Sequence, residues 1–246
     1  SLNMLHISLQ AEKIFQFGSY PVTNAILTSW LVMGFLLIVT FLNKSRLTVV
    51  PGRFQIIMEG VVGGLYGLFE SVTGVRTKIY FPLVGTLFIY IIALNWAGLL
   101  PGVGSIGFHG IKDGVKEFIP LFRSGAADLN LTIALALISM GSIQYFGLKT
   151  LGIQYLSRFL NFKNPILFYV GILEFISEGS KIISFAFRLF GNIFAGEVLL
   201  TVIAFLMPLF VPLPFLAMEL FVGFIQALVF SLFTAVFLNV ATAQEH

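Results

Sequence analysis

Residues 165–206 read PILFYVGILEFISEGSKIISFAFRLFGNIFAGEVLLTVIAFL, a long apolar stretch that begins with proline and contains a few charged residues. At 1.5 Å per residue, one helix over this stretch would be about 63 Å long, whereas the hydrocarbon core of a bilayer is about 30 Å thick. The stretch therefore predicts a membrane helix that is either broken or strongly tilted. It also places Arg188 inside an apolar run, where a charge at the bilayer centre costs roughly 2.5–3.5 kcal/mol.

The composition of the whole chain also indicates a membrane protein. Of its 246 residues, 58% are hydrophobic and only 10% are charged, whereas a soluble globular protein has about 25% charged residues. The chain has no cysteine, which excludes disulfides, thiol catalysis and thiolate metal sites. Its net charge of +3 is not gathered on a basic face with interleaved aromatic residues, which argues against a nucleic-acid partner.

Four further apolar segments are long enough to cross a membrane: 22–42, 79–100, 131–148 and 214–243. Asp128 stands before the third of them and is a natural helix N-cap, and the last one begins with proline. We therefore predict an all-α polytopic membrane protein with about five membrane helices. The last two would be long, strongly tilted and paired as an antiparallel hairpin.

A sixth apolar segment lies between the first two spans and carries Glu59 and Glu70. These residues are eleven positions apart, so they lie on one face of a helix at 100° per residue. This pattern predicts an interfacial helix at the cytoplasmic surface. A re-entrant or short buried segment is the alternative.

The chain reads as a single membrane domain, 1–246, without internal repeats. It divides into an outer N-terminal segment 1–21, N-terminal helices and loops 22–164, and the tilted helix hairpin 165–246. Lys and Arg gather in the loops after the first and third spans, which predicts an N-terminus outside and a C-terminus in the cytoplasm. The loop 102–127 is predicted to be a lid over the outer entrance.

One face of the 165–206 stretch carries a polar stripe about 80° wide at 100° per residue. Its members are Glu174, Glu178, Lys181, Arg188 and Asn192. Glu178 and Lys181 are three positions apart and can form an ion pair. Arg188 has no acidic residue within four positions, so it either pairs with another helix of the bundle or awaits a carboxylate from outside this chain.

Glu219 and Gln226 lie on one face of the last segment because they are seven positions apart. In an antiparallel hairpin the numbers of facing residues have a constant sum. The residue numbers of the pair Arg188–Gln226 and of the pair Glu197–Glu219 add up to nearly the same sum. Both pairs therefore predict a turn near residues 207–208.

Two facing carboxylates in a low dielectric should not both be ionised, so one of them would hold a proton. Such a pair near a fixed cation is typical of a proton path. A water-filled cleft or a metal site could use the same groups, although the absence of nearby His or Asp and of any Cys makes a metal the weaker alternative.

Several motifs along the chain resemble one known family. They are LNWAGLLPG at 94–102, ADLNLT at 127–132, LEFISEGSKIISFAFRLFGNIFAGE at 173–197, Gln226 and the terminal QEH. In this order they are similar to the subunit a family of the rotary F-type ATP synthase, the static membrane subunit beside the c-ring. The motif at 173–197 is long and specific, and the others are weaker when taken alone.

The resemblance implies a role for Arg188. It would face an essential carboxylate on each c subunit as the ring turns, and it would stand between two aqueous half-channels that open to opposite sides. Without it, protons would leak directly between the half-channels, and each leaked proton would dissipate about 2.3 kcal/mol per 100 mV. A guanidinium suits this position because it stays charged where an ammonium can deprotonate.

The resemblance also implies a set of site residues. Glu197 and Glu219 would line the outer half-channel, Asn192 and Gln226 would lie near Arg188, and Asn95, Asp128 and Asn130 match polar positions of the outer side. Caps and hydrogen bonds between helices are the alternative for the last three. Glu174 and Glu178 are predicted to lie toward the cytoplasmic exit, from their place on the stripe and the predicted orientation.

The implied partners are the c-ring, the b subunits of the peripheral stalk, the remaining ATP synthase subunits and membrane lipids. We expect no cofactor and no metal. The chain has no P-loop, so any ATP chemistry would take place on partner subunits. At Gly191 and Glu197 the chain resembles bacterial members of the family more than mitochondrial ones, which implies a protein of the bacterial plasma membrane, with an organelle inner membrane as the alternative.

Two other classes of function fit the sequence less well. A secondary transporter would show an inverted repeat with broken helices in both halves, and none is visible. A purely structural membrane protein would not need the polar stripe or the facing acidic pair.

Overall fold

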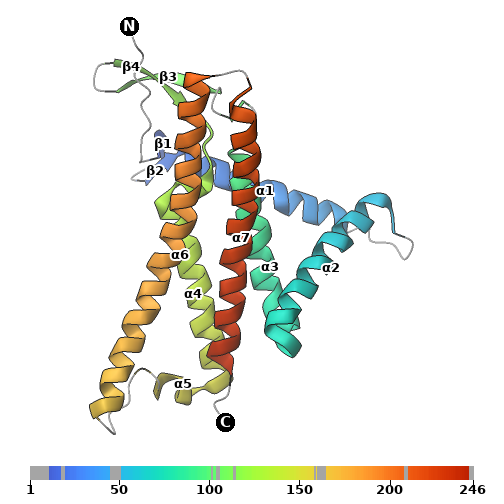
Figure 1. Ribbon diagram of the computed structural model, residues 1–246, viewed down its shortest axis with the longest axis vertical. Helices are drawn as coiled ribbons and strands as arrows, with labels where there is room; N and C mark the ends of the chain where they lie inside the picture. The colour runs from blue at the N-terminus through green and yellow to red at the C-terminus, as the bar shows by residue number, and fades with distance from the viewer. Residues whose placement is uncertain are drawn as a thin grey trace. The chain divides into compact units, whose positions relative to one another are not determined.

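The computed structural model describes residues 11–17, 20–44, 51–100, 102–103, 106–112, 115–157, 159, 165–207 and 210–243. Within these residues, five helical segments are long and apolar enough to cross a membrane, which confirms the predicted all-α polytopic class (Figure 1). They are α1 (Asn24–Lys44), the run of α2 (Arg53–Thr73), η1 (Gly74–Arg76) and α3 (Thr77–Ala97), α4 (Leu129–Leu151), α6 (Pro165–Leu206) and α7 (Pro212–Thr242).

The chain forms two compact units. Unit 1 comprises Ser1–Arg46, Ile89–Leu131 and Leu189–Ala227, and unit 2 comprises Leu47–Phe88, Thr132–Arg188 and Leu228–His246. The helices α3, α4, α6 and α7 contribute residues to both units. The single membrane domain expected from the sequence stays a prediction, and each unit is described by itself.

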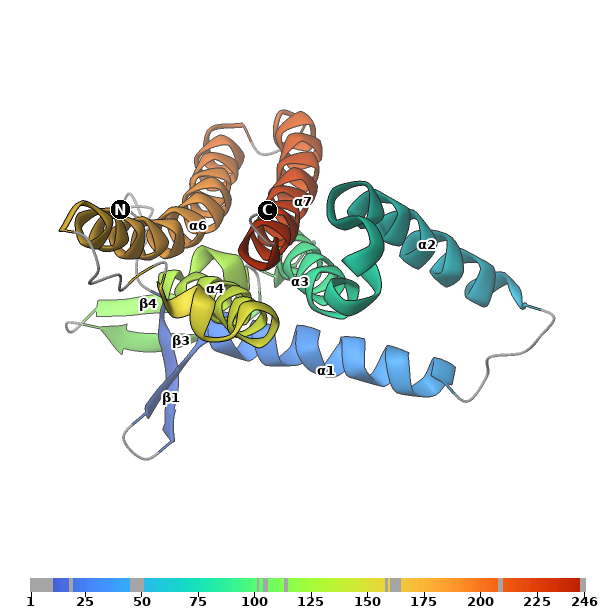
Figure 2. The same ribbon diagram turned by 90° about the horizontal axis from the view of Figure 1, so that it is seen from below.

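Unit 1 contains two short antiparallel hairpins in addition to its helices. One joins β1 (Lys13–Phe17) to β2 (Tyr20–Thr23), and the other joins β3 (Gly107–Lys112) to β4 (Val115–Pro120). The Asn24 side-chain amide donates a hydrogen bond to the Pro120 carbonyl at 3.3 Å, so the two hairpins end at the same place (Figure 2). The loop 102–127 is therefore partly a hairpin, followed by the short helix η3 (Gly125–Ala127). Its role as a lid stays a prediction.

The first helix has the surface expected of a segment in lipid. Its N-terminus is capped by Thr23, whose Oγ1 accepts a hydrogen bond from the Ile26 amide at 3.3 Å. Farther along, large apolar side chains such as Phe35 and Phe41 are exposed, Phe41 by 78%. A water-facing helix would carry polar side chains at these positions, so these residues fit contact with lipid.

In unit 2, α2 turns into α3 at Gly74 (Figure 2). This residue has φ +57°, a conformation that glycine adopts without a steric penalty and that commonly ends helices. The following Arg76 and Tyr80 both hold the end of α7: the Arg76 guanidinium donates to the Thr242 carbonyl at 2.6 Å, and Tyr80 Oη lies 2.7 Å from Thr242 Oγ1. The interfacial position of α2 in a membrane stays a prediction.

The helix α4 continues after Gly152 into α5 (Ile153–Ser157). The ring of Tyr155 lies so close to Gly147 that a Cβ there would meet it at 2.6 Å. Within the same unit, α4 also contacts α7 through the hydroxyls of Ser139 and Thr234, 2.8 Å apart. These small side chains allow close helix packing and a hydrogen bond between helices.

The helices α6 and α7 pair as the predicted antiparallel hairpin. In unit 2, the ring of Phe185 lies 5.0 Å from that of Phe230. In unit 1, Asn192 Nδ2 donates to Gln226 Oε1 at 2.7 Å. The two pairs have nearly the same sum of residue numbers, and α6 ends at Leu206 while α7 begins at Pro212, which agrees with the predicted hairpin. Residue 208 of the predicted turn lies outside the described residues. Strong tilt in a membrane stays a prediction.

Candidate functional site

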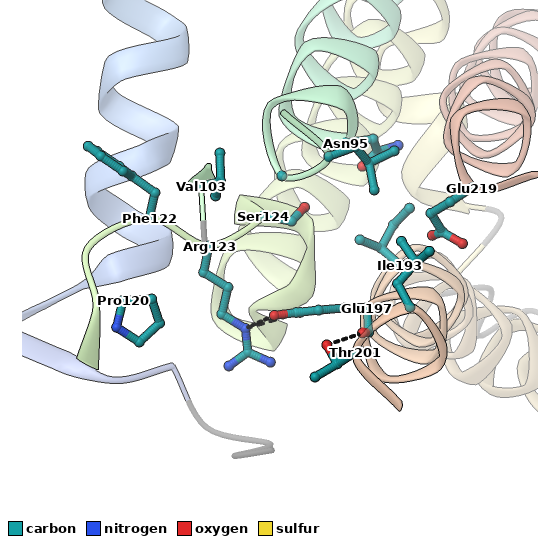
Figure 3. A pocket seen from close by; sticks show the side chains of 13 residues that line it. Asn95, Val103, Pro120, Phe122, Arg123, Ser124, Ile193, Glu197, Thr201 and Glu219 are labelled. Atoms are coloured by element: carbon teal, nitrogen blue, oxygen red, sulfur yellow. Dashed lines mark hydrogen bonds and ion pairs between the residues drawn. The ribbon is translucent and has the colours of Figure 1, made fainter. Parts of the chain in front are cut away.

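The sequence-predicted acidic pair lines a cavity of about 210 Å³ in unit 1 (Figure 3). Its wall comes from α3, from the loop segments around β3 and β4, from α6 and from α7. Three of the lining side chains are charged: Arg123, Glu197 and Glu219. The structure thus brings Glu197 and Glu219 to one cavity, as the hairpin register predicted, and adds a cation that the sequence did not single out.

Glu197 is engaged by Arg123. The Arg123 Nε atom lies 3.0 Å from Glu197 Oε1 and 3.1 Å from Oε2. The arginine is only 7% exposed, whereas the Glu197 side chain is 33% exposed. The guanidinium also lies 5.8 Å from the centre of the Phe194 ring, within range of a cation–π contact. Glu197 therefore has a fixed counter-charge within unit 1.

Glu219 is the less satisfied of the two acids. It is 4% exposed, and its Oε1 atom has no hydrogen-bond partner within the described part of the chain. Its carboxyl group packs directly on the backbone of Gly196, where any Cβ would overlap the carboxyl carbon and both oxygens. The absence of a side chain at residue 196 therefore makes room for the Glu219 carboxyl between α6 and α7.

Two amide side chains of unit 1 are only half satisfied. Asn95 Nδ2 donates to the Gly223 carbonyl at 2.9 Å, but its Oδ1 is buried without a partner among the described residues. The Oε1 atom of Gln226 accepts a hydrogen bond from Asn192. The Nε2 atom of Gln226 is buried and also has no partner among the described residues. Leaving a buried polar atom unsatisfied costs about 1–3 kcal/mol.

Asp128 and Asn130 lie at the start of α4. Asp128 Oδ1 accepts a hydrogen bond from the Asn130 backbone amide at 2.9 Å, which confirms the predicted N-cap. The second oxygen of Asp128 is buried without a partner within the described residues, whereas Asn130 is exposed. Neither residue lines the cavity.

Arg188 belongs to unit 2 and is exposed on α6. Its Nη2 donates a hydrogen bond to Ser184 Oγ at 3.3 Å, and its guanidinium carbon lies 5.0 Å from the centre of the Phe233 ring. It lines a shallow pocket of about 190 Å³ together with Lys181 and Phe185. Within the described part of the chain Arg188 forms no ion pair.

Glu178 of the polar stripe contacts both a cation and an amide side chain. Glu178 forms the predicted pair with Lys181, at 2.6 Å, which confirms that spacing argument. Its other oxygen accepts from Gln144 Nε2 at 3.1 Å, and Gln144 in turn accepts from Tyr155 Oη at 2.7 Å. Glu174 is half-buried on the same helix.

Sequence reasoning missed Arg123 and the packing role of Gly196. Arg123 lies in a loop of mixed charge, and only its position five residues before Asp128 could have drawn attention to it. The predicted level of Arg188 and Gln226 joins residues of different units and stays a prediction. Among the described residues, no group of three or more His, Cys, Asp or Glu side chains is placed to hold a metal ion.

Comparison with known proteins agrees with these features. The family model described as ATP synthase A chain matches residues 26–239. The chain is 32% identical over 234 residues to ATP synthase subunit a 2 of Bradyrhizobium sp. (strain BTAi1), covering 95% of each chain. It is also 30% identical to ATP synthase subunit a of Moorella thermoacetica, covering 96% of this chain and 97% of that one.

A third relative, ATP synthase subunit a of Gloeobacter violaceus, is 35% identical over 224 residues, which is 91% of this chain and 85% of that one. These similarities extend over nearly the whole chain, and the sources of all three relatives are bacteria. Together with the matching family model, they show that the chain belongs to the ATP synthase subunit a family, a component of the membrane sector CF(0).

Proposed function

We propose that this chain is the ion-conducting stator subunit of a bacterial ATP synthase membrane sector. It provides two offset half-channels through which protons reach and leave the carboxylates of a c-ring, and Arg188 blocks direct leak between them while driving rotation. The observation that carries the proposal is the exposed Arg188 on α6, which forms no ion pair within the described part of the chain. An exposed guanidinium in an apolar segment is suited to a carboxylate that arrives from another subunit.

The outer half-channel uses residues of unit 1. Glu219 takes up the proton, with Asn95, Gln226 and Asn192 along its route and Glu197 on the cavity wall. Buried polar atoms without protein partners are usually satisfied by water, and Asn95, Glu219 and Gln226 each contribute one such atom. Asp128 and Asn130 lie toward the outer side of the same unit.

The inner half-channel uses the part of the polar stripe that lies in unit 2. Glu174 and Glu178 lead from Arg188 toward the cytoplasm, at the end of α6 that begins with Pro165. Glu178 is paired with Lys181, and both acids are placed along this route. The chain is a multi-pass protein of the bacterial plasma membrane with its N-terminus outside, and its partners are the c-ring, the b subunits and the other ATP synthase subunits.

Vesicles carrying the assembled complex test this function with Arg188→Ala. We expect ATP-driven proton pumping to be lost and a passive proton leak to appear, because the variant removes the fixed charge that separates the half-channels. Lys149→Ala is the matched control, since Lys149 is an exposed basic residue in the last turn of α4.

The control should pump like the wild type with no added leak. Pumping that survives intact in Arg188→Ala would show that this arginine only holds helices together. Pumping lost without any leak, at normal assembly, would support a role in driving the ring but would remove the role of Arg188 as the barrier.

A further inference from the structure

Arg123 is the charged side chain of the unit 1 cavity that the proposed path leaves without a role. It is buried, and it points into the cavity from the loop after β4, as Figure 3 shows. We propose that Arg123 is the specificity-determining residue of this cavity, which makes it admit protons and exclude metal cations. The inference rests on the proposed function, because it concerns the outer route to the same carboxyl.

Without the arginine, the cavity would be suited to a metal cation. Its wall would offer the carboxylates of Glu197 and Glu219 and the unpartnered amide oxygen of Asn95. Carboxylate and amide oxygens are the ligands that Ca²⁺ prefers. A metal cation bound in this way would block the carboxylate of Glu219, which takes up the proton in the proposed path.

Arg123 changes both the charge and the available oxygens. Its Nε is within 3.1 Å of both oxygens of Glu197, so a metal ion would have to displace a guanidinium to bind them. Because a guanidinium stays protonated, Arg123 always offsets the charge of Glu197. Of the residues that line the cavity, this leaves Glu219 as the one carboxyl that can attract a metal cation.

A proton is not excluded by the same arrangement. It moves along hydrogen bonds and needs a single acceptor, whereas a hard metal ion needs several oxygen ligands at once. Glu219 supplies that acceptor, since its Oε1 is buried without a partner among the described residues. Arg123 therefore leaves one carboxyl for protons and removes the second that a metal would require.

The position of Arg123 is fixed by contacts of the loop that carries it. Its backbone amide donates to Thr28 Oγ1 on α1 at 3.3 Å, and the hydroxyl of Ser124 donates to the Leu94 carbonyl on α3 at 3.4 Å. Gly125 follows, where an added Cβ would meet Leu94 at 2.8 Å. A charge held in this way acts at one place in the cavity, as selectivity requires.

Proteoliposomes with the purified complex, its ATP-hydrolysing side outward, test the proposal. Their lumen contains either CaCl₂ or choline chloride at equal ionic strength, and EGTA and MgATP are added outside. We expect Ca²⁺ at about 1–10 mM, above the range in which weak protein sites bind it, to leave wild-type pumping unchanged. The same Ca²⁺ should slow the initial pumping rate of Arg123→Gln at least about twofold, as expected when half or more of such sites are occupied.

Three controls separate charge from structure. Arg123→Lys keeps the charge and should stay insensitive to Ca²⁺. The double variant Arg123→Gln/Glu197→Gln removes one charge of each sign and should be insensitive again. Lys13→Gln removes an exposed cation of the same unit, on β1, and should behave like the wild type.

The result that overturns the proposal is pumping by Arg123→Gln that Ca²⁺ does not affect, or wild-type pumping that Ca²⁺ inhibits. If Arg123→Gln does not assemble, Thr201→Glu adds a carboxylate to the cavity wall with Arg123 in place. It should become sensitive to Ca²⁺, and its insensitivity would equally overturn the proposal. Failure of the proposed function would look different, since the wild type itself would not pump or Arg188→Ala would pump intact.

Discussion

Gly196 sets the position of the Glu219 carboxyl, although it carries no functional group. The carboxyl lies against the glycine backbone, in space that the Cβ of any other residue would occupy. The acid on α7 and the glycine on α6 therefore act as one site. A substitution at residue 196 is therefore expected to displace the Glu219 carboxyl.

We predict that Gly196→Ala displaces Glu219 and strongly reduces proton pumping per assembled complex. Overpacking of this kind costs about 1–3 kcal/mol, and here the neighbour that must move is the carboxyl itself. Gly179→Ala is the matched control, because it lies in the same helix and a Cβ there meets nothing within 4 Å. Equal pumping rates of the two variants, measured by quenching of a pH-sensitive dye, would contradict the prediction.

The residues of the site differ in how far the sequence could reveal them. Arg188 was identifiable from the sequence alone because it is a cation in an apolar stretch with no acidic residue within four positions. Glu197 and Glu219 followed from the hairpin register. Arg123 could not be found in this way, since its partner is 74 positions away and no periodicity connects a loop to a helix face.

At the scale of elements, the C-terminal end of α7 is held by side chains from the start of α3 and the turn before it. The Arg76 guanidinium donates to the carbonyl and the hydroxyl of Thr242 at 2.6 and 2.8 Å. A cation at the last carbonyls of a helix also interacts favourably with the helix dipole. Arg76 therefore stabilises the last turn of α7.

We predict that Arg76→Ala loosens this last turn. A hydrogen bond to a charged group contributes about 1.5–3 kcal/mol, so backbone amide exchange over residues 238–242 should become about tenfold faster or more. Lys78→Ala serves as the control because Lys78 is an exposed cation two positions later in the sequence. Unchanged exchange in Arg76→Ala would show that water replaces the guanidinium at no cost.

Helix bounds were easier to predict than the strands. The bounds of α6 agree with the prediction because proline marks its start and a proline-rich turn follows its end. The strands β3 and β4 were missed because their sequences, GFHGIK and VKEFIP, lack the strict alternation of apolar and polar residues that marks a strand. Their pairing depends on a partner strand, which local sequence does not show.

At the scale of the whole molecule, five crossings by the five apolar helical segments would place residues 13 and 243 on opposite sides of a membrane. The chain has no cysteine, so single cysteines can be introduced without background labelling. We predict that Lys13→Cys reacts with a membrane-impermeant maleimide from outside the cell and Ala243→Cys only from the cytoplasmic side. Labelling of both from one side would refute the odd number of crossings, and reversed labelling would refute the predicted orientation.

The continuity of α6 has a mechanical consequence. The helix runs unbroken from Pro165 to Leu206 with Arg188 well inside it, 23 residues after its first residue and 18 before its last. If a passing carboxylate pulls sideways on Arg188, the load spreads along a hydrogen-bonded rod before it reaches a loop. A flexible joint beside the arginine would absorb that pull by bending. Under the proposed function, a continuous helix on both sides of Arg188 would pass this pull on as torque.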